Sequence, residues 1–359
     1  MSGNAGARAY ELLRRKAREI GADLQSLATS YAIERFMARL SRVDEHGNIT
    51  VKGGQSLGIL FGNRMRPTKD LDINISLEGI DNPEEWIRIA VLAACNDSTE
   101  DGVSYDAAAI TIEQREHQGD GGLRVTMPCS VHTCRTPFMI DIGIGNEITF
   151  LPSKVRVAGI LGDAKNAPEP LETLIYPHEN TLAEKIVSKI EDGISSIRHK
   201  DFFDIWLLVE ILRRAGDLRL LVPGGEGLST EERMLAESVR EGLSDGTLLD
   251  LPETEISRAC LDRLGLALRR TADHRGTELP ENLHSWFMDE FGGNPMQSAQ
   301  WANWCRNQKN RLLFQPPGTE KQVAKENSLG HLIDNIGPLV DEIARIAHMH
   351  CAKTSSPGL

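Results

Sequence analysis

Apolar and polar residues follow distinct spacings along the chain. Over residues 8–42 apolar side chains return every three or four positions, which predicts an amphipathic helix. Residues 70–75 read Asp-Leu-Asp-Ile-Asn-Ile, and this alternation predicts a strand with one buried face. A second helix is expected over residues 83–97, where Pro83 and Glu84 are typical of a helix start.

The remaining elements divide the chain near residue 170. Further strands are expected at 49–51, 106–116, 122–131 and 138–144, a short helix at 57–61, and a proline-containing loop over 150–175. From Tyr176 onward the pattern is helical. We therefore expect an α/β (α+β) protein with a mixed sheet in residues 1–170, a helical lobe in 171–315, and a linker with a terminal helix in 316–359.

Composition fits this organisation. The chain has 359 residues, 40% hydrophobic and 26% charged, which suffices for two ordinary domains. No apolar run approaches the roughly 20 residues of a membrane span, and the start lacks the apolar segment of a signal peptide. We expect a cytoplasmic protein with no membrane partner. The net charge of −12 argues against a large nonspecific nucleic-acid surface.

Asp70 and Asp72 are the first candidates for chemistry. On a strand they share one face, where two carboxylates repel each other and resist burial. A divalent cation relieves that repulsion, because Mg²⁺ or Mn²⁺ takes oxygen ligands and keeps room for phosphate oxygens. Two surface acids on an edge strand are the alternative, and for an isolated Asp-x-Asp that alternative is the better one.

The turn that precedes this strand favours the metal site over two surface acids. Gly53-Gly54-x-Ser56 stands between a strand and a helix, where glycines let backbone N–H groups approach a phosphate. Ser56 is expected either to cap the helix or to donate to the phosphate. A strand, this turn, a short helix and Asp-x-Asp together have the layout of polymerase-β-type nucleotidyltransferases. Asp141, on the expected strand 138–144, is the candidate for the third acid, with an ion pair to an arginine as its alternative.

The helical half contributes a second group of charges. Lys185 and Lys189 are four residues apart and share a helix face, while Asp201 and Asp204 stand three apart on the next helix. Such residues either form structural ion pairs or bind a triphosphate and orient an acceptor hydroxyl. Spacing alone does not separate these two interpretations.

Several stretches resemble the AbiEii/AbiGii toxin family of nucleotidyltransferases, to which the MenT-type toxins are related. The matching segments, from about Leu24 to about Trp304, are LATSYAIERFMARLSR, VKGGQSL, RPTKDLD, IDIGIGN, YPHENTLAEKI, KDFFDIWLL, RRTADHRGTELP and QWANW. The resemblance implies a polymerase-β-like core with a helical C-terminal lobe.

The resemblance also assigns roles to individual residues. By motif, Gly53, Gly54 and Ser56 match the nucleotide-phosphate turn, Thr68 stands before the metal-binding pair Asp70 and Asp72, and Lys185 and Asp204 match the helical lysine and the later acid. In the reaction we expect, Arg66, Thr68 and Lys185 help to bind the nucleotide, and Asp141 joins Asp70 and Asp72 at the metal. Catalysis is then expected from Asp70, Asp72, Asp141, Lys185 and Asp204. Asn146 departs from the pattern, because relatives often carry an aspartate there. Asp141 therefore remains the candidate for the third acid.

The implied activity is that of a toxin in a toxin–antitoxin or phage-abortive pair. It transfers NMP from an NTP to an acceptor hydroxyl, with release of pyrophosphate and with Mg²⁺ (or Mn²⁺) as cofactor. The implied partners are a cognate antitoxin and, as acceptor, the 3′ end of tRNA. The alternatives are a nucleotidyltransferase that modifies a protein or a small molecule, and a nucleotide-binding regulator without turnover.

Overall fold

The computed structural model describes residues 2–61, 70–115, 122–157, 159–162, 164–165, 167–196, 198–222, 228–308 and 328–354. The chain divides into two compact units. The first contains residues 1–146 and 152–176, and the second contains residues 147–151 and 177–359. No helix in the described ranges combines the length and apolarity that a membrane crossing needs.

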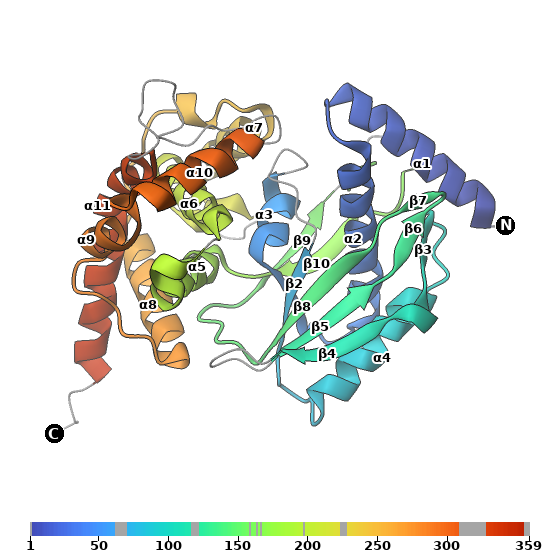
Figure 1. Cartoon of the computed structure of the whole chain (residues 1–359), viewed down its shortest axis with the longest axis horizontal. Helices are drawn as coiled ribbons and strands as arrows, with labels where there is room; N and C mark the ends of the chain where they lie inside the picture. Colours follow the sequence, from blue (N-terminus) through green and yellow to red (C-terminus); the bar gives the residue numbers. More distant parts are fainter. Residues whose placement is uncertain are drawn as a thin grey trace. The chain divides into compact units, whose positions relative to one another are not determined.

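The first unit is built on a seven-stranded mixed sheet (Figure 1). Its strand order is β4-β5-β8-β2-β1-β10-β9; β1 runs parallel to β10 and β2 parallel to β8, and the other neighbours are antiparallel. The strands are β1 (Ile49–Lys52), β2 (Asp70–Ile75), β4 (Thr111–Arg115), β5 (Gly122–Met127), β8 (Phe138–Ile144), β9 (Ser153–Val157) and β10 (Leu171–Ile175). A smaller sheet holds β3 (Val103–Tyr105), β6 (Cys129–Val131) and β7 (Cys134–Arg135).

Alternation along the strands gives the large sheet one apolar and one polar face. Leu71, Ile73, Ile140 and Ile142 are buried in a single core with residues of α2 (Leu24–Val43) and α4 (Pro83–Asn96). These two helices lie against the apolar face of the sheet (Figure 1). The opposite face therefore carries the polar residues of the same strands, including the candidate acids.

Several expectations about elements were wrong. The strand predicted over 106–116 contains a short 3-10 helix (Ala107–Ala109) before β4, and the strand predicted over 122–131 is two strands, β5 and β6, in different sheets. The single helix predicted over 8–42 is two helices, α1 (Ser2–Glu19) and α2, because Gly21 adopts a positive φ of 66° and the Asp23 side chain caps the second helix. The stretch 150–175, expected to be a loop, contributes β9 and β10. Both strands are short, and prolines between them hide their alternation.

The second unit is helical. It contains α5 (His178–Asp192), α6 (His199–Ala215), α7 (Thr230–Asp245), α8 (Arg258–Arg275), α9 (Leu283–Phe287), α10 (Pro295–Gln308) and α11 (Ser328–Thr354). The α6 helix is almost wholly buried, and Gly265 of α8 lets Ile346 of α11 pack directly against the helix backbone. The mixed sheet and the helical C-terminal region confirm the predicted fold class.

Candidate active site

Asp70 and Asp72 point to the polar face of the sheet. Both are half-buried, whereas Leu71 and Ile73 between and after them are fully buried on the other face. The neighbouring apolar side chains thus fix the strand's orientation, because turning it over would expose them and bury the acids. Two carboxylates are held side by side as a result.

A row of charged residues crosses the sheet at the level of Asp72. In register from one strand to the next, the row reads Glu113 (β4), Arg124 (β5), Asp141 (β8), Asp72 (β2) and Lys52 (β1). Residues paired directly across a sheet point to the same face. The two acids at the centre of the row are therefore immediate neighbours, with a cationic residue on each side.

The glycine turn lies against one of these acids. Gly53 begins α3 (Gly53–Phe61) with a φ of 65°, and a Cβ built on it would lie 2.5 Å from Oδ2 of Asp72. Only glycine leaves this space beside the carboxylate open. Gly54 follows in the first turn of α3, where backbone N–H groups lack helical partners.

Ser56 supports the turn from within. Its side chain is fully buried, and its hydroxyl donates a hydrogen bond of 2.8 Å to the carbonyl oxygen of Gly53. In this structure the hydroxyl therefore stabilises the start of α3. Arg66 and Thr68, the other expected nucleotide-binding residues of this segment, lie outside the described residues.

The donor set of Asp70 and Asp72 fits a hard divalent cation. Both offer carboxylate oxygens on one strand face, and the space that a Cβ of residue 53 would fill lies directly beside the Asp72 carboxylate. Across the described ranges, no three His, Cys, Asp or Glu side chains are grouped as a ready metal site.

Asp141 is engaged by two arginines. Arg124 donates from Nε to Oδ1 at 2.7 Å and from Nη2 to Oδ2 at 2.9 Å, and Nη1 of Arg115 lies 3.0 Å from Oδ2. The hydrogen bond to Asp141 raises the pKa of Arg124, and the charges of Asp70 and Asp72 raise it further. The ion pair that sequence reasoning left open as the alternative for Asp141 is present.

Sequence reasoning did not identify the two arginines. The signal was available for Arg124, because it falls on the polar positions of its strand, as Asp141 does on its own. The identity of the partner depended on β5 lying next to β8, and strand order cannot be read from alternation.

Asn146, just beyond β8, donates its backbone N–H to Oδ1 of Asn74 at 3.2 Å.

In the second unit, Lys185 lies between two acids of α6. Its Nζ is 2.6 Å from Oδ2 of Asp204 and 3.1 Å from Oδ1 of Asp201, and the Asp204 side chain is fully buried. Burial raises the pKa of Asp201, but the charges of Lys185 and Arg198 outweigh it and leave the pKa below its ordinary value. The structure therefore shows the ion pairs that the sequence left open as one of two interpretations for Lys185, Asp201 and Asp204, and it adds Arg198, which the sequence did not point to.

Lys189 has a different environment from Lys185. It is fully buried, donates to the Ser196 hydroxyl at 2.7 Å, and lies 4.8 Å from the ring centre of Phe202. Burial lowers the pKa of Lys189 to about 8. Lys189 thus holds the α5–α6 connection from inside the helical unit.

Other residues of the segment YPHENTLAEKI also bind within the second unit. Glu179 accepts from Nη2 of Arg263 at 2.6 Å. Asn180 accepts from the backbone N–H of Thr149 at 3.2 Å and so ties residues 147–151 to α5. These contacts show that part of this segment serves the fold.

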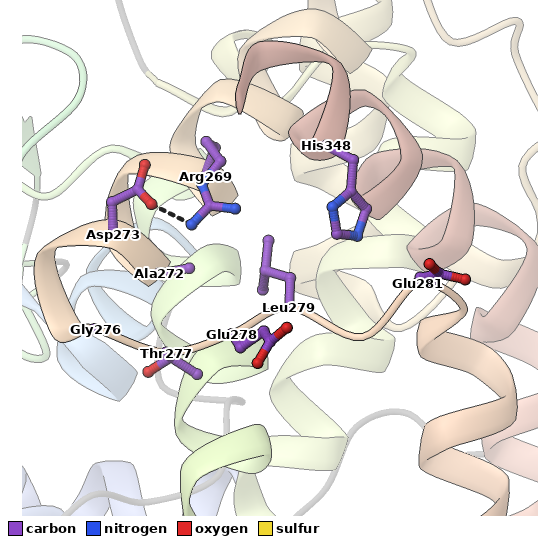
Figure 2. A pocket seen from close by; sticks show the side chains of 9 residues that line it. All are labelled: Arg269, Ala272, Asp273, Gly276, Thr277, Glu278, Leu279, Glu281 and His348. Carbon is purple, nitrogen blue, oxygen red and sulfur yellow. Dashed lines mark hydrogen bonds and ion pairs between the residues drawn. The ribbon is translucent and has the colours of Figure 1, made fainter. Parts of the chain in front are cut away.

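A pocket of about 510 Å³ also lies in the second unit (Figure 2). Its wall comes largely from the segment RRTADHRGTELP, with His348 added from α11, and Arg269 forms an ion pair with Asp273 at its edge. None of the predicted site residues lines it. The lining residues are Arg269, Ala272, Asp273, Gly276, Thr277, Glu278, Leu279, Glu281 and His348.

Among curated proteins, none matches this chain. Two solved Helicobacter pylori structures are similar to it. JHP933 is 14% identical, with 92% of this chain and 97% of that chain covered and a TM-score of 0.39. A candidate nucleotidyltransferase is 13% identical, with 93% and 100% covered and a TM-score of 0.30.

The decisive match is to a family model. The model described as nucleotidyl transferase AbiEii toxin, type IV TA system, matches residues 35–233, which is more than half of the chain. This range contains the glycine turn, the Asp-x-Asp strand and the Lys185 cluster, and it confirms the resemblance drawn from the sequence. The chain belongs to the AbiEii family and is a nucleotidyltransferase, the toxin of a type IV toxin–antitoxin pair.

Proposed function

We infer that this enzyme transfers NMP from an NTP to an acceptor hydroxyl, using Asp70 and Asp72 as the acids at the reacting phosphate. The observation that carries this is the pair of carboxylates on one face of β2, with the Gly53 turn against Asp72. In the reaction, the acceptor oxygen forms a bond to the α-phosphorus. The bond from that phosphorus to the bridging oxygen breaks, and pyrophosphate leaves.

Asp70 and Asp72 would hold one or two Mg²⁺ (or Mn²⁺) ions through their oxygens. Such an ion, when bound, neutralises charge on the phosphates and aligns the attacking and leaving groups. The first turn of α3, opened by Gly53 and Gly54, presents backbone N–H groups suited to phosphate oxygens. Ser56 keeps this turn in place through its bond to Gly53.

We propose the 3′ end of tRNA as the acceptor, with a protein or small-molecule hydroxyl as the second candidate. This proposal rests on the resemblance to toxins that block translation in this way. The antitoxin partner follows from membership of a type IV toxin–antitoxin family.

Incubation of the pure protein with total RNA and each α-labelled NTP in turn tests the acceptor. We expect a labelled band of tRNA size with one preferred NTP, and no such band for Asp72→Asn. Label on protein or on a small molecule, with none on RNA, would replace tRNA by the second candidate. Omission of divalent cation, with a chelator present, should abolish the label.

A further inference from the structure

The arginines beside the acidic pair have no role in the reaction described above. Arg115 and Arg124 are about one third exposed, whereas the Asp141 side chain between them and Asp72 is 18% exposed. The carboxylate is thus the inner member of the group, and the guanidinium groups reach towards solvent on the polar face.

Both oxygens of Asp141 are already used. Arg124 donates two hydrogen bonds to them, at 2.7 and 2.9 Å, and Nη1 of Arg115 forms an ion pair with Oδ2 at 3.0 Å. A carboxylate has about four acceptor sites, so a metal ion at Asp141 would have little room and would lie against two guanidinium cations.

Within the described residues, the arginines keep N–H groups that Asp141 does not occupy. A guanidinium has five N–H groups; Arg124 donates two of them to Asp141, and Arg115 forms a single ion-pair contact with it. Arg124 also lies within the electrostatic influence of Asp70 and Asp72. An anion bound at Asp70 and Asp72 would therefore lie beside two arginines that Asp141 holds in place.

We propose that Asp141 is a positioning residue that anchors Arg115 and Arg124, and that these two arginines bind the triphosphate of the nucleotide. Planar guanidinium groups recognise phosphate oxygens in pairs, and an anchored group loses less freedom when it does so. This inference rests on the proposed function and refines it, because it assigns the metal to Asp70 and Asp72 without Asp141.

The test measures nucleotide and metal binding separately. Mn²⁺ binding without nucleotide is followed by electron paramagnetic resonance, and NTP binding by calorimetry, for wild type, Asp72→Asn, Asp141→Asn, Arg124→Gln and Arg124→Lys. Arg156→Gln is the matched control, since Arg156 is an exposed arginine paired with Glu172 on β9 and β10 of the same sheet. Thermal unfolding verifies that each variant is folded.

We expect Arg124→Gln to raise the Kd for NTP at least tenfold and to leave Mn²⁺ binding within twofold of wild type. Arg124→Lys keeps the positive charge but loses the paired N–H groups of the guanidinium. Its Kd for NTP should lie between those of wild type and Arg124→Gln. Asp141→Asn should weaken NTP binding severalfold with Mn²⁺ binding retained, whereas Asp72→Asn should lose Mn²⁺. Arg156→Gln should match wild type.

Loss of Mn²⁺ binding in Asp141→Asn to the extent seen in Asp72→Asn would make Asp141 a metal ligand and overturn the inference. Unchanged NTP binding in Arg124→Gln, in an enzyme whose wild type transfers nucleotide, would overturn it while leaving the proposed function intact. A wild-type protein that binds neither Mn²⁺ nor NTP would overturn both.

Discussion

Gly53 lies so close to the Asp72 carboxylate that a Cβ at position 53 would be 2.5 Å from Oδ2. This contact joins the glycine turn to the acidic strand, two features that are separated by 19 positions in the sequence. It makes the backbone at residue 53 part of the environment of the acid.

We predict that Gly53→Ala lowers transfer by at least tenfold, because the new methyl group displaces the Asp72 carboxylate or the turn. A positive φ also costs an alanine roughly 1–2 kcal/mol. Gly21→Ala is the matched control, since Gly21 has a similar φ of 66° and none of the described atoms lies within 4 Å of a Cβ there. Thermal unfolding should show that both variants are destabilised, Gly53→Ala more than Gly21→Ala, and the rate of transfer should fall only in Gly53→Ala. Equal rates of transfer in Gly53→Ala and Gly21→Ala would show that the turn at Gly53 is not part of the active site.

Asp72→Asn should abolish transfer while the melting temperature stays unchanged or rises. Asn keeps the shape and removes one of two neighbouring negative charges, Asp72 and Asp141, in the row across the sheet. Glu172→Gln, which alters an exposed acid of the same sheet, should retain full activity. A loss of several kcal/mol in Asp72→Asn would instead identify a buried structural ion pair.

Lys185→Ala should weaken NTP use more than Lys189→Ala, and it should also destabilise the protein. Removing Lys185 leaves the buried acids Asp201 and Asp204 without their cation, which costs about 3–5 kcal/mol. The double variant Lys185→Ala/Asp204→Asn should recover part of that stability in chemical denaturation. If the double variant also regained wild-type KM for NTP, Lys185 would have only a structural role.

Stability should fall as the pH drops from about 6.5 to about 4. Burial lowers the pKa of His178 to about 4, so in this interval the unfolded chain binds a proton that the folded chain does not. The difference from the ordinary value corresponds to about 3 kcal/mol of unfolding free energy, fully retained above pH 6.5. His178→Gln should flatten this part of the pH–stability curve in urea titrations, while His46→Gln, at an exposed histidine, should keep the wild-type slope. An unaltered slope in His178→Gln would assign the acid sensitivity to other groups.

The sequence predicted the parts of this molecule that depend on local pattern. Strict alternation located β2 and the shared face of Asp70 and Asp72. The short helix expected at 57–61 is present, but it begins at Gly53, so the two glycines form its first turn. Gly21 and Asp23 held the signal for the break between α1 and α2, but the apolar repeat on both sides outweighed it.

What remained hidden depends on contacts between distant segments. The arginines that bind Asp141 come from β4 and β5, whose positions in the sheet follow from tertiary packing. For the same reason, the sequence could not decide whether Lys185 forms an ion pair or contacts a phosphate. Spacing placed the charges on two helices, and only the fold brought Asp201 and Asp204 to one amine.

Transfer from NTP labelled in turn at the α- and the γ-phosphate tests the central claim most directly. With Mg²⁺ and total RNA, wild-type protein should place the α-label on the acceptor and release the γ-label as pyrophosphate, whereas Asp72→Asn should do neither. Transfer of the γ-label to the acceptor, or undiminished α-label transfer by Asp72→Asn, would contradict a nucleotidyl transfer centred on Asp70 and Asp72.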